Sequence, residues 1–168
     1  MYKGQIDDCL ALVRLAAIIS ESKQFNWRHR KADPFAEAEW LSVAWAFEKY
    51  AGVDLLATLN GSESNREALA KQCPVQFTDR DSWSDIFSRI LVEKVEPNLG
   101  NGAITVLYEY PACEAALARV CSHDPRVSER FELYACGVEL ANGFGELTDP
   151  AEQRRRFEAE MNLKEQLY

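Results

Sequence analysis

The sequence is short of the residues that build zinc sites and disulfide frameworks. Its 168 residues contain two histidines, His29 and His123, and no Cys-x-x-Cys pair, so a zinc site is not expected. The odd number of cysteines favours free thiols in a reducing compartment over disulfide bonds. The five cysteines are Cys9, Cys73, Cys113, Cys121 and Cys136.

Long apolar runs are also missing. No stretch reaches the roughly 18 consecutive apolar residues that indicate a membrane helix. The run LALVRLAAII near the N-terminus is broken by Arg14 and follows Asp7 and Asp8, where a secretory signal peptide carries positive charge. We therefore expect no signal peptide, no membrane span and a cytoplasmic location.

Positive charge is in the minority. The chain has 19 Lys and Arg residues against 27 Asp and Glu residues, which gives a net charge of −8. This balance argues against a protein dedicated to coating nucleic acid. The strongest basic patch is Arg28–Lys31. We interpret it as a solvated, exposed strand or turn, and a contact with a phosphate or a partner is the alternative.

Helical spacing of apolar residues occupies the first part of the chain. It predicts helices over 5–22, 37–52, 65–73 and 82–100, the last with Ser82 as its N-cap. In the second of these helices, Trp40, Trp45 and Tyr50 are expected in the core.

The second part of the chain has the composition of strands. Three β-rich runs cover 103–111, 126–137 and 138–147, and an Asp149-Pro150 pair then opens a closing helix. We therefore predict one α+β domain over 1–168. It is helical over 1–100, with an antiparallel sheet and the closing helix over 101–168.

Three acids lie seven residues apart in the last two strands, at Glu132, Glu139 and Glu146. Because side chains alternate faces along a strand, Glu139 and Asn142 share one site only if the strand slips by one residue. We expect that slip at Asn142-Gly143, since glycine permits a bulge. A plain Asn-Gly hairpin turn is the alternative.

Acids gathered on one surface favour a bound cation, because like charges across a hairpin destabilise it. Carboxylates together with phosphate oxygens complete the coordination shell of Mg²⁺, and a carboxylate also pairs with an amine. The residues alone thus predict a divalent-metal site or a cationic-substrate site on an antiparallel sheet.

The segment FELYACGVELANGFGELTDPAEQRRRF resembles the one that precedes motif 3 in class II lysyl-tRNA synthetases. The resemblance extends upstream through WSDIFSRILVEKVEPNLG and TVLYEYPACEAALAR. There the chain is most similar to the elongation factor P lysine ligase family, a short synthetase paralogue without an anticodon domain. The resemblance implies a class II catalytic core, an antiparallel sheet with flanking helices.

The same resemblance implies roles for five residues. Glu132 and Glu139 match the carboxylates that hold Mg²⁺ and ATP. Asn142, Phe144 and Glu146 match residues that line the pocket for a lysine-type substrate, with Glu146 facing the side-chain ammonium. The implied reaction is ATP-dependent activation of lysine or β-lysine to an adenylate. The acyl group then passes to a lysine of elongation factor P, or to tRNA.

The sequence departs from the family pattern at the three class II motifs. Motif 1 and the arginines of motifs 2 and 3 are not found, and the run Arg154–Arg156 is interpreted as a solvated helix face. We therefore expect a partial catalytic domain with little activity alone. A non-catalytic amino-acid-binding or interaction module is the alternative. Unpaired sheet edges predict a homo-oligomer.

Overall fold

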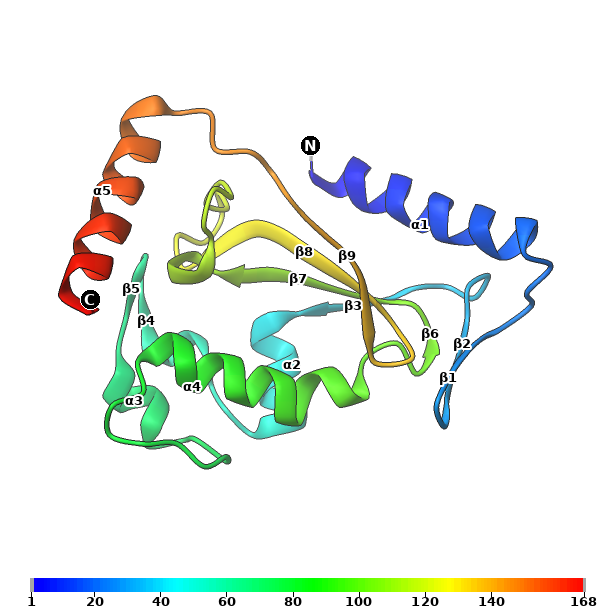
Figure 1. The fold of residues 1–168 in the computed structure, drawn as a ribbon, viewed down its shortest axis with the longest axis horizontal. Coiled ribbons are helices and arrows are strands. Elements are labelled where there is room, and N and C mark those ends of the chain that lie inside the picture. Colours follow the sequence, from blue (N-terminus) through cyan, green and yellow to red (C-terminus); the bar gives the residue numbers. More distant parts are fainter. Residues whose placement is uncertain (1, 168) are drawn as a thin grey trace.

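A four-stranded sheet forms the centre of the fold, with its strands in the order β3-β7-β8-β9 (Figure 1). The computed structural model describes the backbone of residues 2–167 and the side chains of residues 2–159, 161 and 162. The strands of this sheet are β3 (Glu39–Ser42), β7 (Thr105–Pro111), β8 (Val127–Ala135) and β9 (Val138–Phe144). The helices are α1 (Tyr2–Ile19), α2 (Val43–Ala51), α3 (Arg66–Ala70), α4 (Trp83–Ile90) and α5 (Pro150–Leu167).

Two smaller sheets flank the central one. One contains β1 (Phe25–Trp27), β2 (Arg30–Asp33) and β6 (Gly102–Ala103), and the other contains β4 (Leu59–Asn60) and β5 (Glu63–Ser64). The turn between β1 and β2 exposes Arg28 and His29, which confirms a solvated turn at the basic patch. Strands therefore occur at several places within 1–100, a part predicted to be helical apart from the basic segment.

The predicted antiparallel sheet is confirmed in its three main strands. β7 pairs antiparallel with β8, and β8 pairs antiparallel with β9. A two-residue turn at Cys136 and Gly137, with φ of 55° and 72°, joins β8 to β9. Positive φ at both central residues is the geometry that matches the twist of a hairpin.

The predicted helix over 37–52 is wrong at its start. Residues Glu39–Ser42 instead form β3, which pairs in parallel with β7. Helix α2 begins at Val43, because the Ser42 hydroxyl accepts a hydrogen bond from the Trp45 N–H at 3.2 Å and caps the helix. The helix ends at Gly52, whose φ is 67°.

The expected burial of the two tryptophans in this segment is also wrong. Trp40 is 42% exposed and Trp45 is 50% exposed, whereas Tyr50 is half-buried and packs against the core as expected. In β3, Trp40 neighbours the fully buried Leu41, and successive side chains of a strand point to opposite faces. The strand therefore buries the leucine and leaves the tryptophan near the surface.

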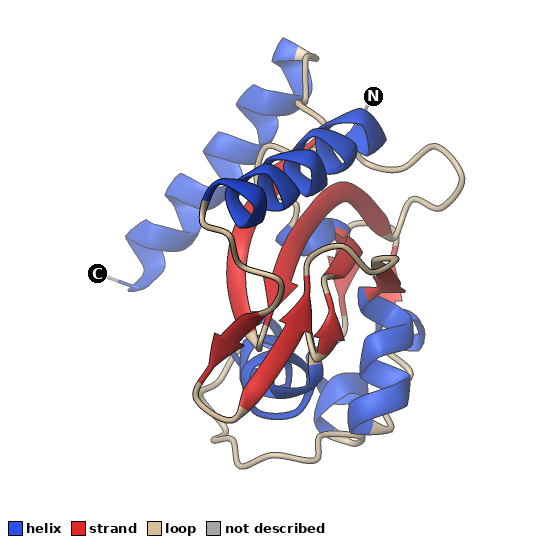
Figure 2. Cartoon of the chain, turned by 90° about the vertical axis from the view of Figure 1, so that its right-hand side faces the viewer, coloured by secondary structure: helices blue, strands red, loops and turns tan. Residues whose placement is uncertain are grey.

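Helices cover both faces of the central sheet. On one face, Ile6 and Leu10 of α1 pack with Phe131 and Leu133 of β8. On the other face lie α2 and α4, and Figures 1 and 2 show these helices opposite α1. Burial of apolar side chains on both faces is the main stabilising term of such a layered fold.

Helix α4 starts as predicted and changes geometry before its predicted end. Ser82 is its N-cap, and Ser82 and Asp85 form a reciprocal capping box. A π-helical turn (Leu91–Val95) and a 3-10 turn (Glu96–Asn98) follow Ile90. These turns carry the chain to Gly100, which lies against the backbone of β8.

Gly100 allows this close approach because it has no side chain. Its φ is 65°, and a Cβ there would lie 2.5 Å from the Cα of Ala135. The Gly100 carbonyl accepts a hydrogen bond from the Cys136 N–H at 2.7 Å. The 3-10 turn is thereby fixed beside the β8–β9 hairpin.

The Asp149-Pro150 signal is confirmed as the start of α5. The Asp149 carboxylate accepts hydrogen bonds from the N–H groups of Ala151 and Glu152. Arg154 and Arg155 are exposed as expected, but Arg156 donates to the carbonyls of Ala116 and Ala118. The arginine run is therefore not wholly solvated, because Arg156 anchors the helix to the loop after β7.

Two further expectations concern the whole described chain. All five cysteines are free thiols, as predicted. Among residues 2–167, no helix combines the length and the apolar character needed to cross a membrane.

Candidate carboxylate site on the central sheet

A buried glutamate lies at the centre of the site. Glu132 on β8 is 4% exposed. Its Oε1 accepts hydrogen bonds from Arg130 at 2.9 Å and from Asn142 at 3.2 Å, and its Oε2 accepts one from the Tyr134 hydroxyl at 2.6 Å. We call these four residues the Glu132 cluster. Such partners are what a buried carboxylate needs to remain charged.

Arg130 is itself held by three kinds of contact. It pairs with Glu132, donates to the Glu114 carbonyl at 3.0 Å, and lies 4.4 Å from the centre of the Tyr110 ring. The ring face attracts the guanidinium by a cation–π interaction. Arg130 therefore stabilises the fold as well as the charge of Glu132.

The predicted slip of β9 exists, and its position differs from the predicted one. Glu139 pairs with Tyr134 and Ala141 pairs with Leu133, so Leu140 is the extra residue. The slip turns Glu139 and Asn142 to the same face of the sheet. Its expected place at Asn142-Gly143 is wrong.

Gly143 makes a packing contact and does not form a bulge. It continues the regular ladder opposite Phe131, and a Cβ on it would lie 2.6 Å from the Phe131 ring. The alternative of an Asn-Gly hairpin turn is also wrong, because both residues lie inside β9.

Two further carboxylates share the electrostatic environment of Glu132. The pKa of Glu139 is raised, first by burial and then by the charge of Glu132. The pKa of Glu96, in the 3-10 turn after α4, is raised by burial and then by the charges of Glu132 and Glu139. Three acids thus repel one another here, and a cation bound between them would relieve that repulsion.

A buried hydroxyl completes the site. Tyr110 is 1% exposed, and its hydroxyl has no hydrogen-bond partner within the described part of the chain. Burial and the charge of Glu132 raise the pKa of Tyr110, so the group is neutral. A polar atom of a bound ligand would satisfy it, and buried polar groups without partners are uncommon in proteins.

The five residues singled out from the sequence divide into two groups. Glu132, Glu139 and Asn142 come together on one face. Phe144 lies further along β9, opposite Arg130. Glu146 lies beyond the strand, where it forms an isolated bridge with Ala118. Its side chain is exposed, and it makes no ion pair or hydrogen bond with the other described residues.

The donor set fits a hard divalent cation. Glu132 Oε1 already accepts two hydrogen bonds, but Oε2 accepts one and keeps a free lone pair. Glu139 is exposed enough to reach a ligand from the same face. Mg²⁺ binds one or two carboxylates and completes its octahedral coordination with phosphate oxygens and water. Glu132 and Glu139 supply that number of carboxylates.

Sequence reasoning missed Glu96, Arg130, Tyr110 and Tyr134. Arg130 and Tyr134 lie two residues on either side of Glu132, so strand alternation alone places all three on one face. Glu96 is 36 residues away in the sequence, and only the turn at Gly100 brings it close. Nothing in its local pattern could have indicated that contact.

The sequence that forms this sheet and its carboxylates matches a known family. Residues 21–168 match the model of the class II tRNA synthetases (D, K and N). The chain belongs to this family. The family resemblance drawn from the acidic hairpin is confirmed, and the α+β architecture is consistent with a class II synthetase-like domain.

Curated relatives share a more specific name, elongation factor P--(R)-beta-lysine ligase. The chain is 38% identical to the one from Histophilus somni (strain 2336) over 130 residues, 77% of this chain and 39% of the relative. It is 45% identical to that from Proteus mirabilis (strain HI4320) over 122 residues, 72% and 37% of the two chains. The alignments with these relatives thus cover less than two fifths of their length.

Proposed function

We propose that this chain contributes the carboxylate side of an active site that activates lysine or β-lysine with ATP. The observation that carries the proposal is the convergence of Glu132, Glu139 and Glu96 on one face of the sheet, beside Asn142. Family membership supports an aminoacyl ligase, and the geometry supports a cation-binding site within it.

At the nucleotide end, Glu139 and the free lone pair of Glu132 would hold Mg²⁺ against the phosphates. A bound Mg²⁺ supplies charge neutralisation at the phosphate that is attacked. Arg130, Tyr134 and Asn142 fix the Glu132 carboxylate in one orientation. This positioning avoids reorganisation of the site during the reaction.

At the amino-acid end, Phe144 lies two residues beyond Asn142 on β9, and Glu146 lies beyond the end of that strand. We propose that Asn142 and Phe144 line the substrate pocket, with Phe144 on the aliphatic part of the substrate, and that Glu146 pairs with its side-chain ammonium.

The proposed chemistry has two steps. A carboxylate oxygen of the amino acid attacks the α-phosphorus of ATP, and the bond to pyrophosphate breaks. The amine of a lysine on elongation factor P then attacks the acyl carbon, and AMP leaves. The names of the relatives support β-lysine and elongation factor P as substrate and acceptor, and lysine and tRNA are the alternatives.

One observation favours the alternative of a non-catalytic binding module. Arg130 is the arginine of the cluster, and its guanidinium is engaged by Glu132, the Glu114 carbonyl and the Tyr110 ring. It is therefore not available to stabilise charge on the α-phosphate. We expect ATP–pyrophosphate exchange by residues 1–168 to be slow for this reason.

Calorimetry with MgATP tests the nucleotide end. We expect Glu139→Gln to weaken binding by about tenfold or more, as loss of a metal-site group typically does. Glu48→Gln, at an exposed acid on α2, is the matched control and should bind like the wild-type chain. Equal affinities in Glu139→Gln and wild type would exclude Glu139 from the metal site.

A second titration with lysine and with β-lysine tests the amino-acid end. Glu146→Gln should weaken amine binding without changing MgATP binding. If binding is retained but no exchange appears even at high protein concentration, the chain is a binding module. Clear exchange by wild type would show that residues 1–168 suffice for activation.

Association and location stay predictions. The exposed apolar residues Leu12 on α1 and Leu140 on β9 line one groove with Trp27 of β1, and such a surface supports the predicted homo-oligomer. Sedimentation of the chain measures this directly. The cytoplasmic location is part of the proposal, since elongation factor P would meet the chain there.

A further inference from the structure

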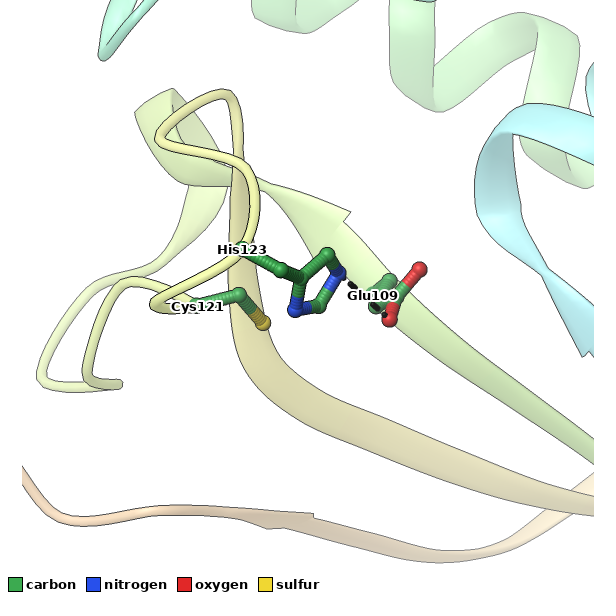
Figure 3. Close-up of side chains that lie close together, drawn as sticks. All are labelled: Glu109, Cys121 and His123. Atoms are coloured by element: carbon green, nitrogen blue, oxygen red, sulfur yellow. Dashed lines mark ion pairs between the residues drawn. The ribbon is translucent and has the colours of Figure 1, made fainter.

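A second group of metal-ligating side chains lies at the irregularity of β7, two residues past Leu107, the strand partner of Glu132. It contains Glu109, Cys121 and His123, whose ligand atoms all lie within 4.8 Å of one another (Figure 3). We call it the Glu109 corner. None of these residues belongs to the site proposed for MgATP.

Folding brings the three residues together from two segments. Cys121 and His123 lie two residues apart on a short hairpin, and Figure 3 shows both side chains close to Glu109. That hairpin is held by a bridge between Val120 and Ser128 and by the Cys121 N–H donating to the Val127 carbonyl at 2.9 Å. Glu109 faces them from β7, which explains why no short sequence motif indicated the site.

The tip of the hairpin is also fixed. Asp124 accepts a hydrogen bond from the Arg126 N–H at 2.9 Å and pairs with the Arg126 guanidinium at 2.8 Å. His123 is therefore carried by a turn whose shape is set before any ligand binds. Preorganised ligands lose less conformational freedom on binding.

The spacing suits tetrahedral coordination. Zn²⁺ bonds of about 2.0–2.3 Å place neighbouring ligand atoms about 3.5 Å apart. Glu109 Oε1 and His123 Nε2 are 3.2 Å apart, and the Cys121 sulfur lies within 4.8 Å of the ligand atoms of both residues. The His123 side chain is 62% exposed, which leaves room for a water as the fourth ligand.

The local charge also favours a cation. Three carboxylates, Glu109, Glu129 and Asp124, lie around this corner and pair with Arg119, Arg126 or His123. Glu129 and Asp124 have arginine partners, Arg119 and Arg126, each at 2.8 Å. Glu109 has the exposed His123 as its partner, so its charge is the least compensated of the three.

We propose that Glu109, Cys121 and His123 form a binding site for a divalent cation of the zinc class. One thiolate, one imidazole and one carboxylate are borderline ligands that select Zn²⁺ over Mg²⁺. The bound ion would displace the thiol proton of Cys121 and link the hairpin to β7. The same hairpin leads from Ala118, the bridge partner of Glu146, so the ion would also stiffen the end of β9.

Titration of the tag-free chain with Co²⁺, followed by displacement with Zn²⁺, tests the site. The wild-type chain should take up one Co²⁺ per chain at this site and show a thiolate-to-cobalt charge-transfer band. Cys121→Ser should abolish that band. His123→Ala should weaken binding by about 10- to 100-fold or more.

Matched controls use the chain's other histidine and a half-buried cysteine. His29→Ala and Cys9→Ser should bind Co²⁺ like wild type. Cys121 is buried, so circular dichroism checks the fold of its variant, and the exposed His123 decides the result if Cys121→Ser is misfolded. Absence of the band in wild type, or equal affinity in wild type and His123→Ala, would overturn the proposal.

Independence from the ligase site is checked in the same experiment. Glu139→Gln, which should weaken MgATP binding, should leave Co²⁺ binding unchanged. Loss of Co²⁺ binding in that variant would place the ion at the Glu132 cluster and contradict the assignment. If the chain binds Co²⁺ but not MgATP, the cation site at the Glu109 corner is still supported and only the proposed function fails.

Discussion

The Glu132 cluster, on β8 and β9, and the Glu109 corner, on β7 and the loop before β8, are two acidic sites that differ in how completely their charges are compensated. Glu132 is buried and accepts hydrogen bonds from Arg130, Tyr134 and Asn142. Glu109 is partly exposed and pairs with the exposed His123 at 3.2 Å. The first carboxylate is therefore part of the fold, while the second remains available to a ligand.

This difference shows why an acid in a strand is not by itself evidence of a ligand site. A buried carboxylate stays charged only when donors surround it. Most of its ligand-binding capacity then lies with neighbours that have fewer partners. Around the Glu132 cluster those neighbours are Glu139, Glu96 and the hydroxyl of Tyr110.

The largest expected effect comes from removing the buried carboxylate. Glu132→Ala leaves Arg130 without its ion-pair partner and Tyr134 without its acceptor. Breaking a buried pair from one side lowers the free energy of unfolding by about 3–5 kcal/mol. Urea unfolding measures it, and Glu139→Ala, at an exposed acid on the next strand, should change stability by about 0.5 kcal/mol or less. A loss below about 1 kcal/mol for Glu132→Ala would contradict a structural role.

The next effect concerns the contact that brings Glu96 to the cluster. Gly100→Ala forces a Cβ to within 2.5 Å of the Ala135 backbone at a φ of 65°. The left-handed conformation and the overpacking together should lower stability by about 3 kcal/mol. Gly61 has a similar φ of 58° and open space around it, so Gly61→Ala should lose only about 1 kcal/mol. Equal losses would mean that the approach to β8 is not tight.

A smaller effect is expected at the Glu109 corner. Glu109 has a φ of 59°, a conformation that disfavours a side chain by about 1–2 kcal/mol. Glu109→Gly removes this strain and a weak surface ion pair, so metal-free stability should stay within about 1 kcal/mol of wild type. Ala116→Gly, at a φ of 49°, is the matched control. Loss of more than about 2 kcal/mol would show that Glu109 is structural.

The smallest effects are pH-dependent and of opposite sign in two acids. The raised pKa of Glu96 means that its charge destabilises the folded state at neutral pH, and this penalty disappears as pH falls toward 4.5. Ion pairing to Arg155 and Arg156 lowers the pKa of Glu152 to about 2, so its stabilisation is present above pH 4.5 and is lost between 4.5 and 2.

Two glutamine variants separate these contributions. At pH 7, Glu96→Gln should be slightly more stable than wild type, and Glu152→Gln should be less stable by about 0.5 kcal/mol. Thermal unfolding at pH 7 and pH 4 should show both differences shrinking at the lower pH. The same sign for both variants at pH 7 would contradict the assigned causes.

The sequence predicted the features that depend on local chemistry. Ser82 and Asp149 cap helices because their side chains reach N–H groups two or three residues away. The pairing of β8 with β9 was also predictable, since the two-residue connection between them favours an antiparallel hairpin. The family followed from the long motif around Glu132 and Glu139.

The features that were missed depend on contacts between distant segments. Strand β3 was predicted as part of a helix, because a strand of four residues is too short to show the two-residue alternation of side chains. The slip at Leu140 was placed at Gly143 because glycine permits a bulge, whereas Gly143 is needed beneath the Phe131 ring. The nearness of Glu96 to Glu132 depends on the Gly100 contact, which no local pattern contains.

The extra residue at Leu140 also bears on aggregation. β9 is the end strand of the central sheet, and a straight, exposed end strand is a template for adding further strands. The slip leaves Val138 and Glu139 on one side of the irregularity and Ala141–Phe144 on the other. An incoming strand therefore meets two short, mismatched ladders, so the irregularity that gathers Glu139 and Asn142 also makes this edge a poor seed for fibres.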